Sequence, residues 1–412
     1  MRSACARPPR DQESVECSLF MFTFTRKTMQ FEFATAARII FGAGTLSGVG
    51  PIVHGFGKRA LVVHGRNSAR ARGLLEALST EGVECTCFSV PGEPTIELVS
   101  DGLKRGREFG IEVVLGFGGG SVIDAAKAIA GLSTNSGEVL DFLEVIGEGK
   151  PLARPALPCI AVPTTAGTGA EVTRNAVLAS PEQGVKVSLR SAFLVPRIAL
   201  VDPELTYTLP KPVTAFTGLD ALTQLIEPFV SSRANPMTDA VCREGLRRVA
   251  PTLQRVFEQG DDAGGRCNMA LGSLFGGLAL ANSALGVVHG FAGPLGGQFP
   301  TPHGAICAAL LPHVMEINVE ALTERAPDHP ALHRYGEIAR IVTGADDATA
   351  VDGIAWVARL CSALQIHGLR SYGVAENDIP ALVDKAAHAS STKGNPIPLT
   401  TAEMSEGLSR SL

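Results

Sequence analysis

Two histidines, His289 and His303, lie fourteen residues apart, and a glycine follows each of them. The glycines and prolines between them predict a turn that brings two helices together. Neutral imidazole is the commonest side-chain metal ligand, so two imidazoles on neighbouring helices need only a carboxylate to complete a metal site. Asp220 is the candidate for that carboxylate, and these three residues form the predicted catalytic centre.

Asp220 lies in the segment LDALTQLIEP, which predicts a helix. Gln224 follows one helical turn later, and side chains at i and i+4 face the same direction. Two oxygen ligands can therefore project together, which makes Gln224 a further candidate metal ligand. The alternative is an ordinary helix with one acid near its start, and the two histidines favour the metal site over it.

The segment GFGGGSVIDAAK places a glycine cluster between a predicted strand and a predicted helix. Without β-carbons, the backbone can be approached closely by a phosphate, and the first amides of the helix point toward it. We therefore predict a diphosphate-binding turn, with a purely structural turn as the alternative because the spacing is not GxGxxG. The candidate cofactor-binding residues here are Gly118, Gly119, Gly120, Ser121 and Asp124.

The segment PTTAGTGAEVT places three hydroxyls, on Thr164, Thr165 and Thr168, beside glycines near the end of a predicted strand. Such a loop can hold the adenosine or the nicotinamide part of a dinucleotide, although by itself it indicates only a turn. Together with the glycine cluster, it predicts a dinucleotide site.

Strand, glycine turn and helix alternate through the first half of the chain. Apolar runs such as Val113–Leu115 and Ile160–Val162 predict strands buried on both faces, as in a parallel sheet covered by helices. Beyond Pro210 and Pro212 the apolar periodicity is almost wholly helical. The sequence therefore predicts a Rossmann-like α/β part followed by an all-α part.

A chain of 412 residues exceeds what one hydrophobic core usually supports. We predict an α/β dinucleotide-binding domain at 29–211 and a helical metal-binding domain at 212–412, packed across a ligand-binding cleft. Residues 1–28 lack periodicity and are predicted to be a disordered extension. An upstream or misassigned start is one explanation for this extension, and an organelle transit peptide is another.

The composition, with 45% hydrophobic and 19% charged residues, is typical of a soluble α/β protein. A net charge of −5 gives no electrostatic basis for nucleic-acid binding, so small molecules are the expected partners. The nine cysteines include no CxxC pair, which indicates reduced thiols in the cytoplasm, and their spacing assigns none of them a role. The apolar stretch 271–299 is rich in glycine, which favours a buried helix and turn over a membrane span.

Six segments occur in the order GGGSVIDAAK, PTTAGTGAEVTRNAV, LVDPELT, GLDALTQLIEP, GVVHGFAGPLGGQFPTPHG and KGNPIP. With them the chain, from about residue 31 to its end, resembles the iron-containing alcohol dehydrogenase family. The family's fold is an N-terminal dinucleotide-binding α/β domain and a C-terminal helical metal-binding domain, related to that of dehydroquinate synthase. The resemblance thus implies the same division as the residue patterns.

In this family an aspartate, a histidine four residues later and two later histidines hold one divalent metal, usually iron and sometimes zinc. The resemblance assigns Asp220, His289 and His303 to three of these positions. Gln224 occupies the fourth, and its weaker amide oxygen implies lower metal affinity. Two histidines with one carboxylate favour Fe²⁺. Gly293 is a second departure, because many relatives have a histidine there that is thought to help proton movement.

The resemblance implies hydride transfer between NAD or NADP and a small alcohol, diol or hydroxy acid, with the metal as Lewis acid. Gly65 stands where NAD-selective members often have an acidic residue, and it leaves room for a 2′-phosphate. Arg66 and Asn67 can contact that phosphate, so either cofactor stays open. A homodimer is expected from the resemblance alone.

Other functions stay open because Gln224 and Gly293 depart from the family pattern. A maleylacetate-reductase-like enzyme can work without metal, but the presence of both histidines counts against it. A dehydroquinate-synthase-like lyase needs basic residues for a phosphorylated substrate, and the segments around Asp220 and His303 offer few. A nucleotide-binding protein with impaired catalysis is the third alternative.

Overall fold

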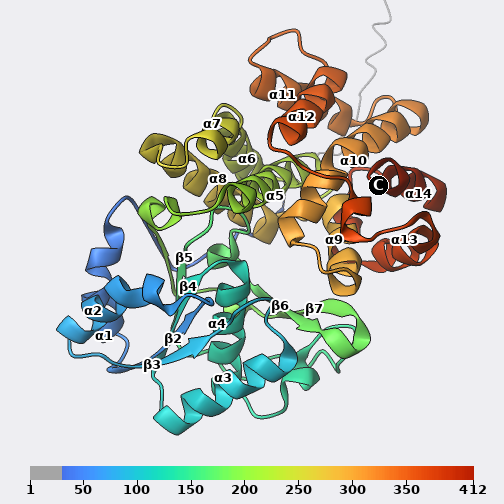
Figure 1. The fold of residues 1–412 in the computed structure, drawn as a ribbon. Coiled ribbons are helices and arrows are strands. Elements are labelled where there is room, and N and C mark those ends of the chain that lie inside the picture. Colours follow the sequence, from blue (N-terminus) through green and yellow to red (C-terminus); the bar gives the residue numbers. More distant parts are fainter. Residues whose placement is uncertain (1–29) are drawn as a thin grey trace, which may run out of the picture. The chain divides into compact units, whose positions relative to one another are not determined.

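The computed structural model describes residues 30–412, so the predicted extension at 1–28 lies outside the described residues. Residues 33–412 form one compact unit. Figure 1 shows a sheet flanked by helices in the first half of the sequence and helices alone in the second half. The predicted fold class, an α/β part followed by an all-α part, is confirmed.

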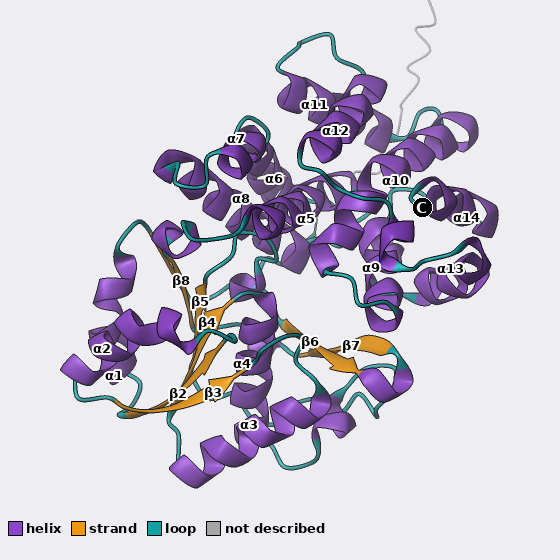
Figure 2. Ribbon diagram, in the orientation of Figure 1, coloured by secondary structure: helices purple, strands orange, loops and turns teal. Residues whose placement is uncertain are grey.

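The main sheet has six parallel strands in the order β1-β8-β5-β4-β2-β3, and β6 pairs with β7 in a separate antiparallel hairpin (Figure 2). The strands are β1 (Arg38–Phe41), β2 (Arg59–His64), β3 (Glu84–Ser89), β4 (Val113–Gly118), β5 (Cys159–Pro163), β6 (Asn175–Ser180), β7 (Val185–Arg190) and β8 (Ile198–Val201). Every residue of β4 and β5 is buried, as their continuous apolar sequences predict for central strands.

Helices cover both faces of the main sheet. They are α1 (Val49–His54), α2 (Arg72–Thr80), α3 (Ile96–Phe109) and α4 (Gly120–Ser133). Alternate side chains of a strand point to opposite faces. On β2, Leu61 and Val63 pack with α3 and α4, whereas Ala60 and Val62 pack with α1 and α2.

The register of the parallel strands brings three chain segments to one edge of the sheet. His64 at the end of β2 is level with Phe117 on β4, and Gly118 at the end of β4 is level with Pro163 at the end of β5. From β2 the chain continues to β3 on one side, and from β4 it continues to β5 on the other. Open α/β sheets bind ligands at such a switch point.

The second half of the described chain is helical. Its helices are α5 (Lys211–Val230), α6 (Pro236–Val249), α7 (Leu253–Glu258), α8 (Ala263–Asn282), α9 (Val287–Gln298), α10 (His303–Arg325), α11 (Pro330–Thr343), α12 (Ala350–Ala363), α13 (Ile379–His388) and α14 (Thr401–Arg410). Helix α5 packs against α6, α8 and α10, and its residues 218–230 are all buried. The predicted boundary at 211/212 falls in the first turn of α5, where a proline needs no amide donor.

Helix α10 is long and apolar enough to cross a membrane by length and composition, and α8 with α9 passes the same test as a pair bent by 98°. Within the protein, 78% of the apolar window of α10 is buried against other elements. We therefore interpret α10 as a core helix. The stretch 271–299 contains the second half of α8 and all of α9, and at least half of the residues of each helix are buried.

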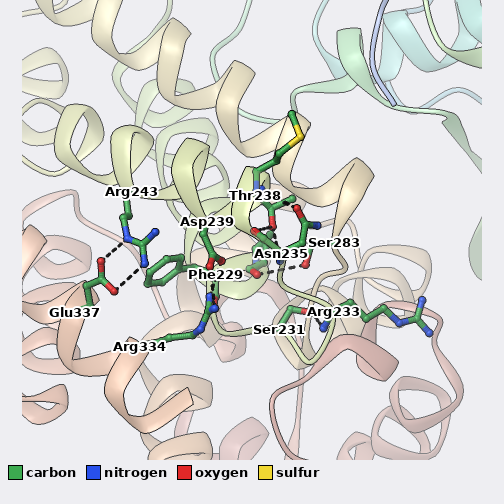
Figure 3. A network of polar contacts seen from close by, with 12 residues as sticks. Phe229, Ser231, Arg233, Asn235, Thr238, Asp239, Arg243, Ser283, Arg334 and Glu337 are labelled. Carbon is green, nitrogen blue, oxygen red and sulfur yellow. Dashed lines mark hydrogen bonds and ion pairs between the residues drawn. The ribbon is translucent and has the colours of Figure 1, made fainter. Parts of the chain in front are cut away.

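The C-terminal end of α5 is fixed by a polar network with α6 and α11 (Figure 3). The Arg334 guanidinium donates to the backbone oxygen of Phe229 at 2.7 Å and to Asp239 Oδ2 at 2.8 Å. Arg243, which pairs with Glu337, stacks on one side of the Phe229 ring at 4.9 Å, and Arg334 lies 5.1 Å from the same ring. These contacts hold the helix that carries Asp220.

The loop after β5 touches the helical part through glycine. Gly169 has φ +59°, and a β-carbon placed on it would lie 2.3 Å from the Cα of Gly277 on α8. A β-carbon on Gly277 would in turn lie 2.5 Å from the Gly169 oxygen. Only glycine at both positions allows the two backbones to approach this closely.

Candidate active site

Helices α5, α9 and α10 bring Asp220, His289 and His303 together. Asp220 Oδ1 lies 3.4 Å from His289 Nε2 and 3.6 Å from His303 Nε2, and the two imidazole centroids are 5.5 Å apart. The three side chains that the sequence singled out therefore face one point. His303 is the most exposed of them, at 37% of its side chain, so the site is accessible from the His303 side.

Cys307, one turn after His303 on α10, faces the same point. Its Sγ lies 3.9 Å from His289 Nε2 and 3.7 Å from His303 Nε2. One donor atom from each of these three residues and from Asp220 lies within 4.8 Å of the others. The cysteine spacing assigned Cys307 no role, because it belongs to no cysteine motif, although it follows His303 by one helical turn.

The chemistry of these donors fits a metal ion. Asp220 is 2% exposed, and its Oδ1 is buried with no hydrogen-bond partner. A buried carboxylate oxygen without a partner is costly unless a cation compensates it. Burial raises the pKa of Asp220, but the imidazoles of His303 and His289 more than offset this and hold it below its usual range. The anionic form that a metal requires is thus favoured.

The pKa values of His289 and Cys307 shift in opposite directions. Burial lowers the pKa of His289, but Cys307, Glu227 and Asp220 more than compensate, so that pKa lies well above its usual value. Burial raises the pKa of the Cys307 thiol, whereas His303 and His289 lower it to below its usual value. Within the cluster the charged forms are therefore favoured: the Asp220 carboxylate, the Cys307 thiolate and the His289 imidazolium.

Glu227 orients His289. It lies two turns after Asp220 on α5, and its Oε2 is 2.6 Å from His289 Nδ1. A carboxylate at Nδ1 fixes the ring so that Nε2 faces the other donors, as in carboxylate–histidine–metal arrangements. Glu227 Oε1 also accepts the Val288 amide at 2.8 Å, and Asn395 Oδ1 accepts the Val287 amide at 3.3 Å. Both contacts fix the first turn of α9.

Gln224 and Gly293, the two departures from the family pattern, both lie in helices of the site. Gln224 is buried, its amide forms a hydrogen bond that lowers the pKa of Asp220, and its Oε1 has no hydrogen-bond partner. That oxygen lies 3.5 Å from the β-carbon position of Gly276 on α8. A β-carbon on Gly293 would meet no atom within 4 Å, so this residue leaves open space. The role of Gln224 as a ligand stays a prediction.

The glycine cluster and the threonine loop contact each other at the carboxyl edge of the sheet. The Thr164 amide donates to the Gly118 oxygen at 2.9 Å. A β-carbon would lie 3.4 Å from Thr165 Oγ1 if placed on Gly119, and 2.7 Å from Thr168 Cγ2 if placed on Gly120. Helix α4 begins here without a side-chain cap on its first amides. Ser121 lies in its first turn, so these predicted residues share one place.

The segment after β2 lies at the same edge. A β-carbon on Gly65 would meet no atom within 4 Å. Arg66 is exposed and donates to the Pro91 oxygen at 3.4 Å. Asn67 Oδ1 accepts the Ala69 amide at 3.1 Å and caps a short helical turn. Open space and an exposed cation are therefore present where the 2′-phosphate is predicted.

Asp124 makes internal contacts instead of pointing to an open edge. Its Oδ1 lies 2.9 Å from Lys127 Nζ and its Oδ2 accepts the Val177 amide at 3.1 Å. The fully buried Lys127 also donates to the Ala170 oxygen and to Thr173 Oγ1, each at 3.0 Å. These contacts tie α4 to the threonine loop, and a direct role of Asp124 in cofactor binding stays a prediction.

The buried carboxyl group of Glu171, in the same loop, should make the folding stability of the protein depend on pH. Burial raises its pKa to about 7 in spite of its own amide and of Lys127. The folded protein therefore holds a proton that the unfolded chain releases near pH 4.3, so stability falls as pH rises from about 4 to 7. We expect Glu171→Gln to remove that fall, on the order of 3 kcal/mol. Urea unfolding at pH 5 and pH 8 measures it, and an equal pH difference in both proteins would contradict it.

Both halves of the chain match a family of known proteins. The model for "Iron-containing alcohol dehydrogenase" matches residues 36–203, and that for "Fe-containing alcohol dehydrogenase family, C-terminal" matches residues 214–412. The 1,3-propanediol dehydrogenase of Klebsiella pneumoniae is 35% identical over 379 residues, which are 89% of this chain and 96% of the relative.

The chain belongs to the iron-containing alcohol dehydrogenase family.

Solved structures agree with this membership. A 1,3-propanediol oxidoreductase superposes with a TM-score of 0.86 at 31% identity, covering 93% of this chain and 100% of that one. The sulfoacetaldehyde reductase of Bifidobacterium kashiwanohense, solved with NAD⁺, gives 0.82 at 28% identity over 93% and 99%. This alcohol dehydrogenase is therefore an oxidoreductase acting on CH–OH groups.

Three residues that contact the predicted site residues were not themselves predicted as site residues: Cys307, Glu227 and Lys127. Spacing offered a signal for the first two, because Cys307 follows His303 by four residues and Glu227 follows Asp220 by seven. Lys127 likewise follows Asp124 by three residues, but its other partners in this dehydrogenase, Ala170 and Thr173, lie far along the chain.

Proposed function

We propose that this enzyme is a metal-dependent NAD(P)-linked alcohol dehydrogenase, or aldehyde reductase, acting on a small alcohol, diol or hydroxy acid. The observation that carries the proposal is Asp220 Oδ1, buried without a hydrogen bond and facing the Nε2 atoms of His289 and His303. Asp220, His289 and His303 would hold the ion, Fe²⁺ or Zn²⁺. When bound there, it supplies the Lewis acidity that polarises a substrate oxygen.

The protein's own residues prepare this chemistry. Asp220 contributes a buried negative charge, and Glu227 fixes the His289 ring. The exposed side of His303 gives a substrate access, whereas the apolar walls of α5 and α10 exclude water from the other side. The open space at Gly293 leaves proton movement to water or a mobile hydroxyl. The glycine and threonine loops at the sheet edge would bind the dinucleotide.

A substrate screen tests the function. Short aldehydes, alcohols, diols and hydroxy acids are assayed with both cofactors, with Fe²⁺ or Zn²⁺ added, and with a chelator. We expect reduction of short aldehydes that the chelator abolishes and the metal restores. Full activity in chelator, in a protein without iron or zinc, would favour the maleylacetate-reductase-like alternative. Absence of any turnover with nucleotide still binding would favour the protein with impaired catalysis.

We propose that NADP is accepted, because Gly65 leaves open space and Arg66 is exposed beside it. An acidic side chain there repels a 2′-phosphate. We therefore expect Gly65→Asp to lower the ratio of kcat/KM for NADPH over NADH by about 10- to 100-fold, since each tenfold is about 1.4 kcal/mol. Gly264→Asp adds the same charge at an exposed position in the first turn of α8 and should leave the ratio unchanged. An unchanged ratio in both variants would mean that position 65 does not face the ribose.

A cytoplasmic homodimer remains the expected form of this enzyme. Sedimentation of the purified protein measures the oligomeric state, and a monomer at micromolar concentration would contradict it.

A further inference from the structure

The fourth metal position is the feature that sets this chain apart from its family's pattern. Gln224 stands where the family has a histidine, and Cys307 lies one helical turn after His303 with its thiol facing the same point. Cys307 is fully buried, at 0% exposed, so its sulfur reaches the site without competing solvent. The lost imidazole on α5 is thus matched by an additional donor on α10.

The distances between donor atoms fit a tetrahedral ion. With metal–nitrogen, metal–oxygen and metal–sulfur bonds of about 2.0 to 2.3 Å, neighbouring ligand atoms of a tetrahedron are separated by roughly 3.3 to 3.6 Å. The separations here are 3.4 and 3.6 Å from Asp220 Oδ1 to the two imidazoles. From Cys307 Sγ to the imidazoles they are 3.9 and 3.7 Å. The two edges from Asp220 therefore lie in the tetrahedral range, and the two edges from the Cys307 sulfur, at 3.9 and 3.7 Å, are slightly longer than it.

Gln224 has a different environment. Its side chain is among the groups that lower the pKa of Asp220, and its Oε1 lies 3.5 Å from the β-carbon position of Gly276 on α8. A neighbour that favours the ionised form of a ligating carboxylate acts as a positioning residue for it. The second turn of α5 thus supports Asp220, and α10 supplies two donors at i and i+4.

We propose that Cys307 Sγ is the fourth protein ligand, so that the centre is Asp220, His289, His303 and Cys307, and that it selects Zn²⁺ over Fe²⁺. Thiolate is a soft ligand that suits zinc, whereas a site without sulfur suits ferrous iron better. Coordination requires the thiolate, and the thiol proton leaves to solvent when the ion binds. Zinc accepts expansion from four to five ligands, so the exposed side of His303 keeps an approach for substrate.

The inference rests on the proposed metal dependence and specifies its ligands. Cobalt is the probe, because Co²⁺ occupies zinc sites and a thiolate ligand gives it a charge-transfer band in the near ultraviolet. Metal-stripped full-length protein is titrated anaerobically with Co²⁺, and bound metal is counted after gel filtration. We expect one ion per chain together with the thiolate band. Bound Co²⁺ without the band would overturn the inference and leave the metal-dependent function standing, whereas failure to bind any metal would overturn both.

Substitutions of two cysteines test whether the sulfur that binds the ion is that of Cys307. Cys307→Ser should bind Co²⁺ without the band, and Cys307→Asn should weaken Zn²⁺ binding by at least about 100-fold, since loss of even an outer contact costs 10- to 100-fold. Cys361→Ser is the matched control, because this buried thiol donates to the Ala308 oxygen beside the site, and it should keep the band. Retention of the band in Cys307→Ser would overturn the assignment.

Metal selection is a separate readout. Under anaerobic competition between equal Fe²⁺ and Zn²⁺, the unchanged protein should retain zinc, and Cys307→Asn with Gln224→His should shift the retained fraction toward iron. Restoring the histidine in that double variant should also recover metal affinity that Cys307→Asn alone has lost. If Cys307→Asn retains zinc as the unchanged protein does, Gln224 or water completes the site and the inference is wrong.

Discussion

Asp220→Asn is expected to lower kcat/KM by at least about 10³-fold, because the ion it helps to hold contributes several kcal/mol to the transition state. The substitution keeps the shape of the side chain and removes its charge. The amide then faces two imidazoles at 3.4 and 3.6 Å without the anion that a divalent ion requires. Bound metal should fall in parallel, from about one ion per chain to a small fraction.

Metal content and steady-state kinetics measure this effect, and thermal unfolding shows whether the variant folds. Asp239→Asn is the matched control, since Asp239 is also a buried acid of the helical part and pairs with Arg334 (Figure 3). It should lose stability, by about 3 kcal/mol, with metal content retained. A folded Asp220→Asn protein with full metal content and activity would show that this carboxylate is not a ligand.

Gly169→Ala has the second-largest expected effect, a loss of roughly 2 to 5 kcal/mol of unfolding free energy. A left-handed backbone costs a residue with a β-carbon about 1 to 2 kcal/mol. The new methyl group would also lie 2.3 Å from the Gly277 Cα, and such overpacking adds about 1 to 3 kcal/mol. Because the obstacle is backbone, relief requires that the threonine loop and α8 move apart.

The matched control is Gly82→Ala. Gly82 has φ +70°, nearly the same backbone conformation, but its β-carbon would meet no atom within 4 Å. Urea unfolding of both variants separates the backbone cost from the contact cost, and only Gly169→Ala should also weaken dinucleotide binding, because Thr168 is its neighbour. Equal losses in the two variants would mean that the contact with Gly277 contributes nothing.

The α/β part and the all-α part of the fold could both be predicted, because strands and helices are recognised from patterns of neighbouring residues. A fully apolar strand such as Val113–Gly118 reports that both of its faces are covered, whichever helices cover them. A helix shows itself through the period of its apolar residues, as α5 does across Asp220. The order of the strands in the sheet could not be predicted in this way, because strands such as β2 and β4 pair although they lie about 50 residues apart in the chain.

The sequence predicted which residue types form the sites better than it predicted which contacts their side chains make. Asp124 belonged by position to the glycine turn, yet Lys127 and the Val177 amide occupy its carboxylate. Buried polar groups must find partners, and those partners come from whichever element packs nearby. Cys307 shows the same limit, since its spacing from His303 was visible but the imidazole of α9 beside it was not.

By itself, the sequence determined the residue types able to bind a metal and a dinucleotide, and the local periodicity that places them on helices and turns. The tertiary structure decided which of those residues meet. Asp220, His289 and Cys307 come from three helices, and only the packing of α5, α9 and α10 brings their donor atoms within 4.8 Å. Helical period is a property of neighbouring residues, whereas convergence depends on contacts between distant segments that no local pattern records.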